Sequence, residues 1–255
     1  MVWVILAWSA AAADPLDEYA TVLTTHVDEA GLVDYAGLAQ DREGLDAFAR
    51  SVATLDAEQY ASWTPAEQLA FWINAYNALT LQLIVDHYPI EPSDVGAGQP
   101  ANSIRQIDGA WDRMTFTVMG ERRTLDHIEH KIIRARFQDS RIHMALVCAA
   151  LSCPALRAEP YRGDMLGRQL DDQARAFVTN PSRVQLDRER GVVTVSPIFD
   201  WFAGDFDVLE GGSGNGVIDF ISRYLDDEGA KAWLLESAYE IEYFPYDWTL
   251  NEQMQ

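Results

Sequence analysis

The chain has 255 residues, 48% of them hydrophobic, and a formal net charge of −21 at pH 7. Its eight Trp, ten Tyr and ten Phe predict a packed globular protein rather than a disordered one. The negative charge repels phosphate backbones and anionic lipid surfaces, so we expect no nucleic acid among the partners.

The chain begins MVWVILAWSAAAADP, with an apolar run from Val2 to Ala13 that is too short to span a bilayer. We interpret residues 1–13 as a signal peptide and therefore expect a periplasmic or extracellular protein. No Lys or Arg precedes the run. Either the true start therefore lies upstream, or the segment is a buried N-terminal helix in a cytoplasmic protein. No later stretch is long and apolar enough for a membrane helix, so stable membrane insertion is not expected.

Apolar residues at helical spacing predict helices over 16–27 and 40–52. A stronger helix is predicted to begin at Thr64, which can cap it, with Pro65 in its first turn, and to stop at Pro89. Its apolar positions cover nearly the whole circumference. We therefore expect it to be the central buried helix of the protein.

The rest of the chain alternates short elements. We predict a hairpin at 111–124, a helix at 124–137, a buried strand at 141–148, an amphipathic helix at 164–179, a hairpin at 183–195, helical residues at 217–235 and a strand at 240–244. No repeat or domain boundary is evident, so residues 14–255 are predicted to form a single α+β domain. Its central helix would pack on a small, mostly antiparallel sheet, as in papain- or transglutaminase-type enzymes.

Cys148 and Cys153 are the only cysteines and follow the predicted strand. A thiolate is a strong nucleophile where a base or a positive field lowers the thiol pKa. In an exported protein the two cysteines would instead close a disulfide. The spacing alone leaves both interpretations open.

His143 is the nearest candidate base. A straight strand rises about 3.3 Å per residue, which separates His143 from Cys148 by roughly 16 Å and points them to opposite faces. Cys153 becomes a rival nucleophile if the intervening loop folds back. The alternative is that His143 is a hydrogen-bonded core residue.

The segment TLDHIEHK carries His127, Glu129 and His130. On an α-helix the two histidines, three apart, share a face that Glu129 does not share; an ordinary charged surface helix would look the same. With His143, Cys148 and Cys153, the histidines make five potential zinc ligands within a short stretch, although their spacing matches no closed zinc pattern. We expect no cofactor, with zinc as the alternative.

Polar residues also occur in two apolar segments. Asn74 and Asn77 lie on the central helix, where they either tie irregular backbone to the helix or line a site and orient a histidine. The segment PIFDWFAGDF is interpreted as an aromatic plug for the core, with Asp200 and Asp205 as helix caps.

Together these segments resemble the "domain of unknown function 547" family. The resemblance rests on FWINAYNAL, LDHIEHKIIR, IHMALVCAALSCPAL, IFDWFAGDF and FPYDWTLN, in that order over about residues 68–250, with GLVDY (31–35) as a fainter match. The sequence departs from the family pattern at Val147, where an Asn is expected. The resemblance implies that Asn74, Glu129, His130, His143, Cys148 and Cys153 belong to one shared centre, and it supplies no activity.

Our leading hypothesis is a cysteine-dependent hydrolase or acyl transferase acting on a small-molecule or peptide ligand. Cys148 or Cys153 would be the nucleophile, His143 or His130 the base, and Glu129 or Asn74 the residue that orients the base. The second hypothesis is a thiol-disulfide or zinc-binding protein that uses the same residues. The third is a non-enzymatic binding module.

Overall fold

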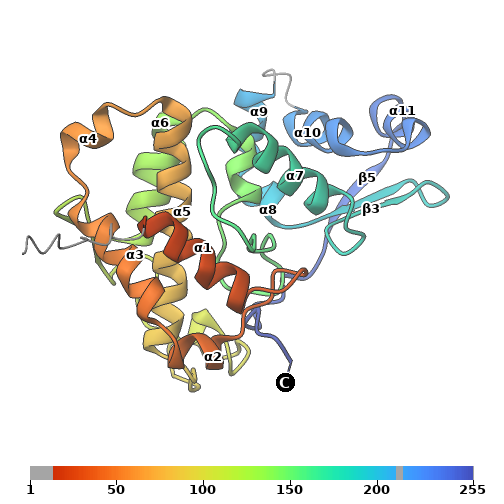
Figure 1. The fold of residues 1–255 in the computed structure, drawn as a ribbon. Coiled ribbons are helices and arrows are strands. Elements are labelled where there is room, and N and C mark those ends of the chain that lie inside the picture. The colour runs from red at the N-terminus through yellow and green to blue at the C-terminus, as the bar shows by residue number, and fades with distance from the viewer. Residues whose placement is uncertain (1–13, 211–214, 255) are drawn as a thin grey trace, which may run out of the picture.

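A computed structural model describes residues 14–210 and 215–254 (Figure 1). The predicted signal peptide at 1–13 lies outside these residues. The helices in the first half are α1 (Pro15–His26), α2 (Tyr35–Gln40), α3 (Glu43–Thr54), α4 (Ala57–Ala61), α5 (Pro65–Asp86), η1 (Ile104–Gln106), η2 (His127–Ile133), α6 (Arg134–Arg136) and η3 (Ser140–Met144). Those in the second half are α7 (Leu166–Val178), α8 (Ile198–Trp201), α9 (Ala203–Leu209), α10 (Gly216–Tyr224) and α11 (Glu228–Glu236).

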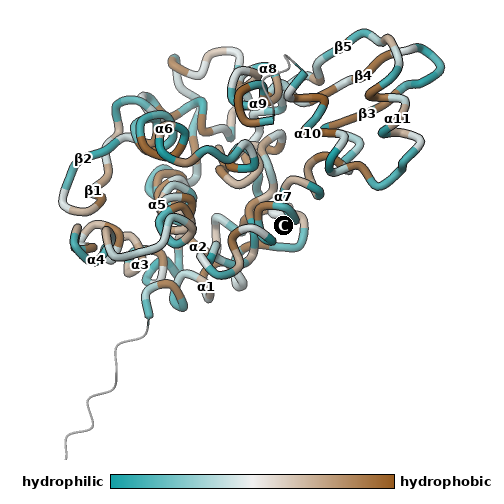
Figure 2. Tube along the Cα trace, turned by 90° about the horizontal axis from the view of Figure 1, so that it is seen from above, coloured by the Kyte–Doolittle hydropathy of each residue, from teal (hydrophilic) through white to brown (hydrophobic). Residues whose placement is uncertain are grey.

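Helix α5 is the buried centre of the first half, as its sequence predicts. Thr64 and Glu67 form a capping box at its start, and Pro65 occupies the first turn. Its most extensive contacts are with α2, α3, α7 and η2, so helices rather than a sheet cover it. Figure 2 shows α5 surrounded by α1, α3, α6 and the β1–β2 hairpin.

The strands form two small sheets. β1 (Phe116–Val118) and β2 (Glu121–Arg123) make an antiparallel hairpin. In the second sheet β4 (Val192–Val195) lies between β3 (Val184–Asp187), to which it is antiparallel, and β5 (Glu240–Tyr243), to which it is parallel. Both predicted hairpins and the last strand are therefore present, and the α+β class is confirmed.

Within residues 14–210 and 215–254, two hydrophobic clusters form the core. The larger one includes Trp72 of α5 and the apolar faces of α1, α3 and η2. The smaller one contains Phe199, Phe206 and Phe220, together with inward residues of β3 and β4. Figure 1 shows α1–α6 on one side of the molecule, and α7–α11 with the second sheet on the other.

The strand predicted at 141–148 is wrong. The chain forms the 3₁₀ turn η3, whose start is capped by the Asp139 carboxylate, and then runs irregularly past Cys148. The reason lies on α5, where the buried Asn77 amide donates to the Ala145 carbonyl oxygen at 3.0 Å and accepts from the Val147 amide at 3.1 Å. A side chain thus satisfies backbone groups that a neighbouring strand would otherwise have to satisfy.

Two predicted helices also differ from the structure. The helical run at 217–235 is broken into α10 and α11, because the Asp227 carboxylate accepts from the amides of Gly229 and Ala230 and starts a new helix. The helix predicted at 124–137 contains the π-wound turn η2. Within the described part of the chain, no helix is long and apolar enough to cross a membrane.

We predict that Asn77→Ala lowers the free energy of unfolding by about 2–4 kcal/mol, because it leaves a buried amide N–H and a buried carbonyl without partners. Chemical denaturation of the wild type and the variant measures the difference. Gln40→Ala is the control: its amide bonds the Ala36 carbonyl on the exposed surface, so its loss should cost far less. Equal stability of wild type and Asn77→Ala would contradict the anchoring role.

Candidate functional site: a disulfide beside an aromatic pocket

Cys148 and Cys153 are joined by a disulfide, with their Cα atoms 6.0 Å apart. The bond closes the irregular loop that follows η3. The two cysteines are not equally exposed, because Cys153 is buried at 5% exposure and Cys148 is only half-buried. We therefore expect a reagent that approaches from solvent to react at Cys148.

The disulfide borders a cavity of about 230 Å³ between the two hydrophobic clusters. Five of the six candidate residues line it: Glu129, His130, His143, Cys148 and Cys153. The remaining lining residues are Tyr76, Arg105, Trp111, Asp126, Leu146, Pro154, Ile198, Trp201, Phe202, Tyr246 and Trp248. We call this cavity the aromatic pocket.

Tyr246 touches both sulfur atoms. Its hydroxyl lies 3.2 Å from Cys148 Sγ and 3.3 Å from Cys153 Sγ. Burial raises the pKa of the Tyr246 phenol, and the negative charge of Glu129 raises it further, although Arg183 opposes the shift. The phenol is thus a neutral O–H donor. The Cys148 amide gives Cys153 Sγ a second donor at 3.0 Å.

Glu129 and His130 enter the pocket from η2. The Glu129 carboxylate accepts from the Tyr76 hydroxyl at 3.0 Å, and its other oxygen lies 3.8 Å from His130 Nδ1. His127 is exposed and contacts Arg123 instead. The expectation that His127 and His130 share a face is therefore wrong, because the wider π winding of η2 changes the angle between residues three apart.

His143 is buried at the edge of the pocket and makes a hydrogen bond that the sequence did not reveal. Its Nε2 lies 2.9 Å from the Asp205 carboxylate, which also accepts two hydrogen bonds from Arg134. The His143 ring stacks on Phe202 with centroids 4.0 Å apart. The hydrogen bonds from His143 and Arg134 hold the pKa of Asp205 well below its usual range. Asp205 is thus an ion-pair partner rather than the helix cap expected for it.

Three tryptophans and Tyr246 form one wall of the pocket. Trp201 stacks on Trp248 with centroids 6.1 Å apart, and Tyr246 packs against both rings. Trp111 meets Trp248 edge-on. Trp201 is 49% exposed, so one side of this wall faces solvent.

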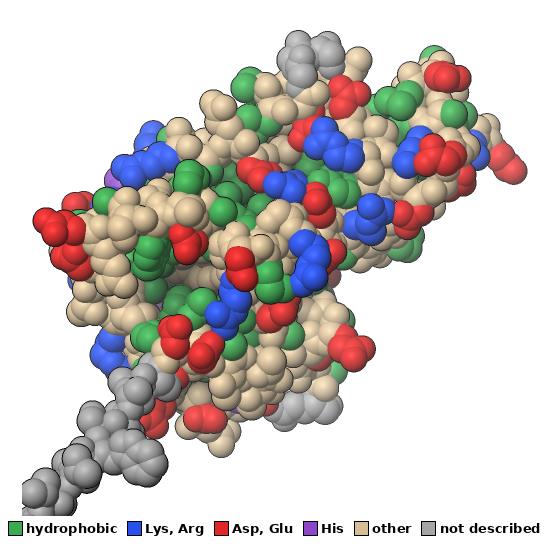
Figure 3. Space-filling view, turned by 45° about the horizontal axis from the view of Figure 1, so that its top comes forward, with side chains coloured by type: hydrophobic (Ala, Val, Ile, Leu, Met, Phe, Trp, Pro, Cys, Tyr) green, Lys and Arg blue, Asp and Glu red, His purple; other side chains and the backbone are tan. Residues whose placement is uncertain are grey.

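Asn74 does not reach the aromatic pocket. Its amide donates to the Tyr161 carbonyl oxygen at 2.7 Å and accepts from the Tyr161 amide at 2.8 Å, which ties a loop to α5. It lines instead a wider groove of about 670 Å³ that Phe48, Trp63 and other residues complete. Figure 3 shows a hollow on this face, edged by hydrophobic and charged side chains, beside the start of the described chain.

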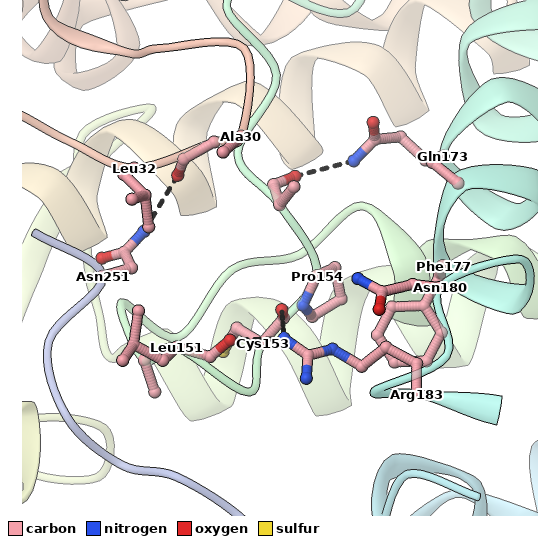
Figure 4. Close-up of a pocket in the computed structure, with 14 residues that line it drawn as sticks. Ala30, Leu32, Leu151, Cys153, Pro154, Gln173, Phe177, Asn180, Arg183 and Asn251 are labelled. Atoms are coloured by element: carbon pink, nitrogen blue, oxygen red, sulfur yellow. Dashed lines mark hydrogen bonds between the residues drawn. The ribbon is translucent and has the colours of Figure 1, made fainter. Parts of the chain in front are cut away.

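Cys153 also borders a second, smaller cavity of about 100 Å³ (Figure 4). Gln173, Asn180 and Arg183 are among the polar side chains that line it. The Arg183 guanidinium donates to the carbonyl oxygen of Leu151 and, at 3.5 Å, to that of Cys153. Arg183 therefore holds the cysteine loop through its backbone carbonyl groups, whereas Tyr246 bonds the two sulfur atoms.

No group of three His, Cys, Asp or Glu side chains within residues 14–210 and 215–254 is arranged to hold a metal ion. Four of the five potential zinc ligands line the aromatic pocket, where the cysteines bond to each other and His143 bonds Asp205. His127 lies outside the pocket and contacts Arg123.

Sequence reasoning missed Tyr76, Asp205, Tyr246 and the tryptophans of the pocket. Tyr76 and Tyr246 each lie in a segment on which the resemblance rests, FWINAYNAL and FPYDWTLN, and this was the available signal. Nothing in local spacing indicates that a tyrosine near the end of the chain contacts cysteines about a hundred positions earlier.

Residues 60–178 match a protein family described as "Protein of unknown function, DUF547". The match includes the central helix, η2 and both cysteines, and it ends before Asp205 and Tyr246. No curated protein and no solved structure matches the chain.

We predict that Asp205→Asn destabilises the protein at neutral pH by about 2 kcal/mol, because it replaces a charge-assisted pair with His143 and Arg134. A lowered folded-state pKa contributes stability that is complete above the ordinary carboxyl pKa and is lost as pH falls toward the lowered value. Denaturation from pH 7 to pH 2 should therefore show the wild-type advantage shrinking below about pH 4. A difference that does not change with pH would contradict the assignment.

Proposed function

Because residues 60–178 belong to the DUF547 family, whose description assigns no activity, we propose a function from the chemistry of the aromatic pocket. We propose that the protein is a thiol-disulfide exchange protein whose reactive group is the Cys148–Cys153 disulfide. The observation that carries the proposal is the position of this disulfide: both cysteines line a pocket, Cys148 is the more exposed of the two, and the sulfur of the buried Cys153 has two hydrogen-bond donors.

In the proposed reaction a substrate thiolate attacks Cys148 Sγ. The new S–S bond joins the substrate to Cys148, and the Cys148–Cys153 bond breaks with its electron pair on Cys153 Sγ. The Cys148 amide and the Tyr246 hydroxyl then donate to the Cys153 thiolate, which stabilises the leaving group.

A second thiol of the substrate completes the exchange. As a thiolate it attacks the substrate sulfur of the mixed disulfide, and Cys148 leaves. The substrate dithiol is oxidised to a disulfide while the protein disulfide is reduced to two thiols, so electrons and protons balance. Glu129 and His130 line the same pocket and supply a carboxylate and an imidazole that can accept the substrate thiol protons.

The geometry favours this function over the hydrolase or acyl transferase. A cysteine hydrolase needs a free thiol with an imidazole nitrogen at hydrogen-bond distance. Here the thiols are paired, and the polar side chain that bonds both sulfurs is the Tyr246 phenol. His143 Nε2 bonds Asp205. We propose a periplasmic or extracellular location as well, since disulfides persist in oxidising compartments.

Single cysteine variants test which sulfur reacts. Cys153→Ser leaves the half-buried Cys148 thiol in the pocket, so it should form a mixed disulfide with a small aromatic disulfide reagent. Cys148→Ser leaves Cys153 buried, and we expect it to react at least about tenfold more slowly. Intact-protein mass spectrometry measures both rates. Equal rates, or a wild-type disulfide that excess dithiol cannot reduce without unfolding the protein, would refute the proposal.

Tyr246→Phe tests the leaving-group role. The loss of a hydrogen bond to the Cys153 thiolate should slow reduction of the disulfide by about tenfold, because such a bond to a charged group contributes about 1.5–3 kcal/mol. Stopped-flow measurement with a monothiol gives the rate. Tyr243→Phe is the control, since this tyrosine lies on β5 outside the pocket. An unchanged rate in Tyr246→Phe would show that its hydroxyl has no part in the exchange.

A further inference from the structure

The ring faces of the aromatic pocket already hold a cation. The Arg105 guanidinium carbon lies 5.1 Å from the centroid of Trp248 and 5.9 Å from that of Trp111. The negative faces of indole rings attract such groups. Trp201 belongs to the same wall and is half exposed, and no cation–π contact involves it in the described part of the chain.

Two carboxylates line the pocket with these rings. The Glu129 side chain is only 12% exposed, and its nearest basic atom, His130 Nδ1, lies beyond hydrogen-bond distance at 3.8 Å. Asp126 is 43% exposed and lies 3.9 Å from His130 Nε2. Burial of a carboxylate costs desolvation energy, and no hydrogen-bonded cation offsets that cost for Glu129. A cation supplied by a ligand would offset it.

The cavity is small, at about 230 Å³. Pockets for drug-sized molecules and cofactors are roughly 300–1,000 Å³. One or two amino-acid side chains therefore suit this cavity better than a whole cofactor. A cysteine side chain that reaches Cys148 would bring the side chain of a neighbouring residue against Trp201 and Glu129, which line the same cavity.

We propose that the pocket selects cysteine-containing peptides in which a Lys or Arg lies beside the cysteine. The cationic side chain is held between the Trp201 face and the Glu129 and Asp126 carboxylates while the cysteine sulfur meets Cys148. This inference rests on the proposed thiol-disulfide exchange, because it names the substrate class of the same pocket.

Three blocked tripeptides test the selection, with a cysteine between two lysines, two serines or two glutamates. The rate at which each opens the wild-type disulfide is divided by its rate with a small neutral disulfide, which removes the effect of neighbouring charge on the peptide thiol itself. We expect the normalised rate of the lysine peptide to exceed that of the glutamate peptide by at least about tenfold.

The net negative charge of the protein also attracts cationic peptides at long range. Variants distinguish this general attraction from binding in the pocket. Glu129→Gln should lower the lysine-to-glutamate ratio about tenfold, and Trp201→Leu about threefold. Trp201 is half exposed, so its replacement does not depend on repacking the core. Glu58→Gln removes the same charge from the exposed face of α4 and should leave the ratio unchanged.

The outcomes are distinguishable. Equal normalised rates for the three peptides, or an equal effect of Glu58→Gln and Glu129→Gln, overturn the inference and leave the exchange function standing. If even the peptide with a cysteine between two serines fails to open the disulfide, the exchange function is refuted.

In that case a binding experiment still decides the inference. Peptides that carry serine at the central position, flanked by two lysines or two glutamates, are titrated into the protein while tryptophan fluorescence is measured. Tighter binding of the lysine-flanked peptide, lost in Glu129→Gln, supports the inference, and equal binding overturns it.

Discussion

The candidate site depends on how one irregular segment is held against α5. Residues 145–153 have no strand partner along most of their length, and their buried backbone groups need hydrogen bonds from elsewhere. The Asn77 amide supplies them at Ala145 and Val147, from the middle of an otherwise apolar helix. This side chain holds the backbone just before Cys148, and backbone bonds to Asp247 and Thr249 hold the loop after it, so the disulfide is positioned by segments distant in the chain.

The segment also joins the two hydrophobic clusters. Met144 packs with the phenylalanines of the smaller cluster, whereas Ala145 and Val147 belong to the larger one. The aromatic pocket lies along this boundary, and both halves of the chain contribute to it: Tyr76 and Glu129 come from the first, Trp201 and Tyr246 from the second. The close-packed side chains of each cluster support the pocket residues from behind and so hold the walls of the pocket in place.

Two sets of charged side chains lie in or beside the pocket. His143, Asp205 and Arg134 form a hydrogen-bonded set in which the negative charge is neutralised by an adjacent guanidinium. Glu129 accepts a hydrogen bond from the Tyr76 phenol, lies 3.8 Å from the His130 imidazole, and interacts with the Arg134 guanidinium through charge alone, with no hydrogen bond between them. The first set therefore stabilises the boundary between the clusters, and the second leaves a carboxylate available to a ligand. Burial raises the pKa of the Tyr246 phenol, and the Glu129 carboxylate adds to the shift, so that group stays protonated next to the sulfur atoms.

The sequence alone determined the elements that depend on local periodicity and capping. The Thr64 cap with Pro65 in the first turn, the apolar circumference of α5 and the alternating hairpins are local patterns, so they predicted the α+β class correctly. The clustering of cysteines, histidines and Glu129 likewise marked the region of the pocket. Only the tertiary structure decided that η3 replaces a strand, that η2 is π-wound, and that Asp205 and Tyr246 join residues far away in the chain. Those outcomes depend on hydrogen bonds between segments that are far apart in the chain. Such contacts do not alter the local periodicity of the sequence, so they cannot be predicted from it.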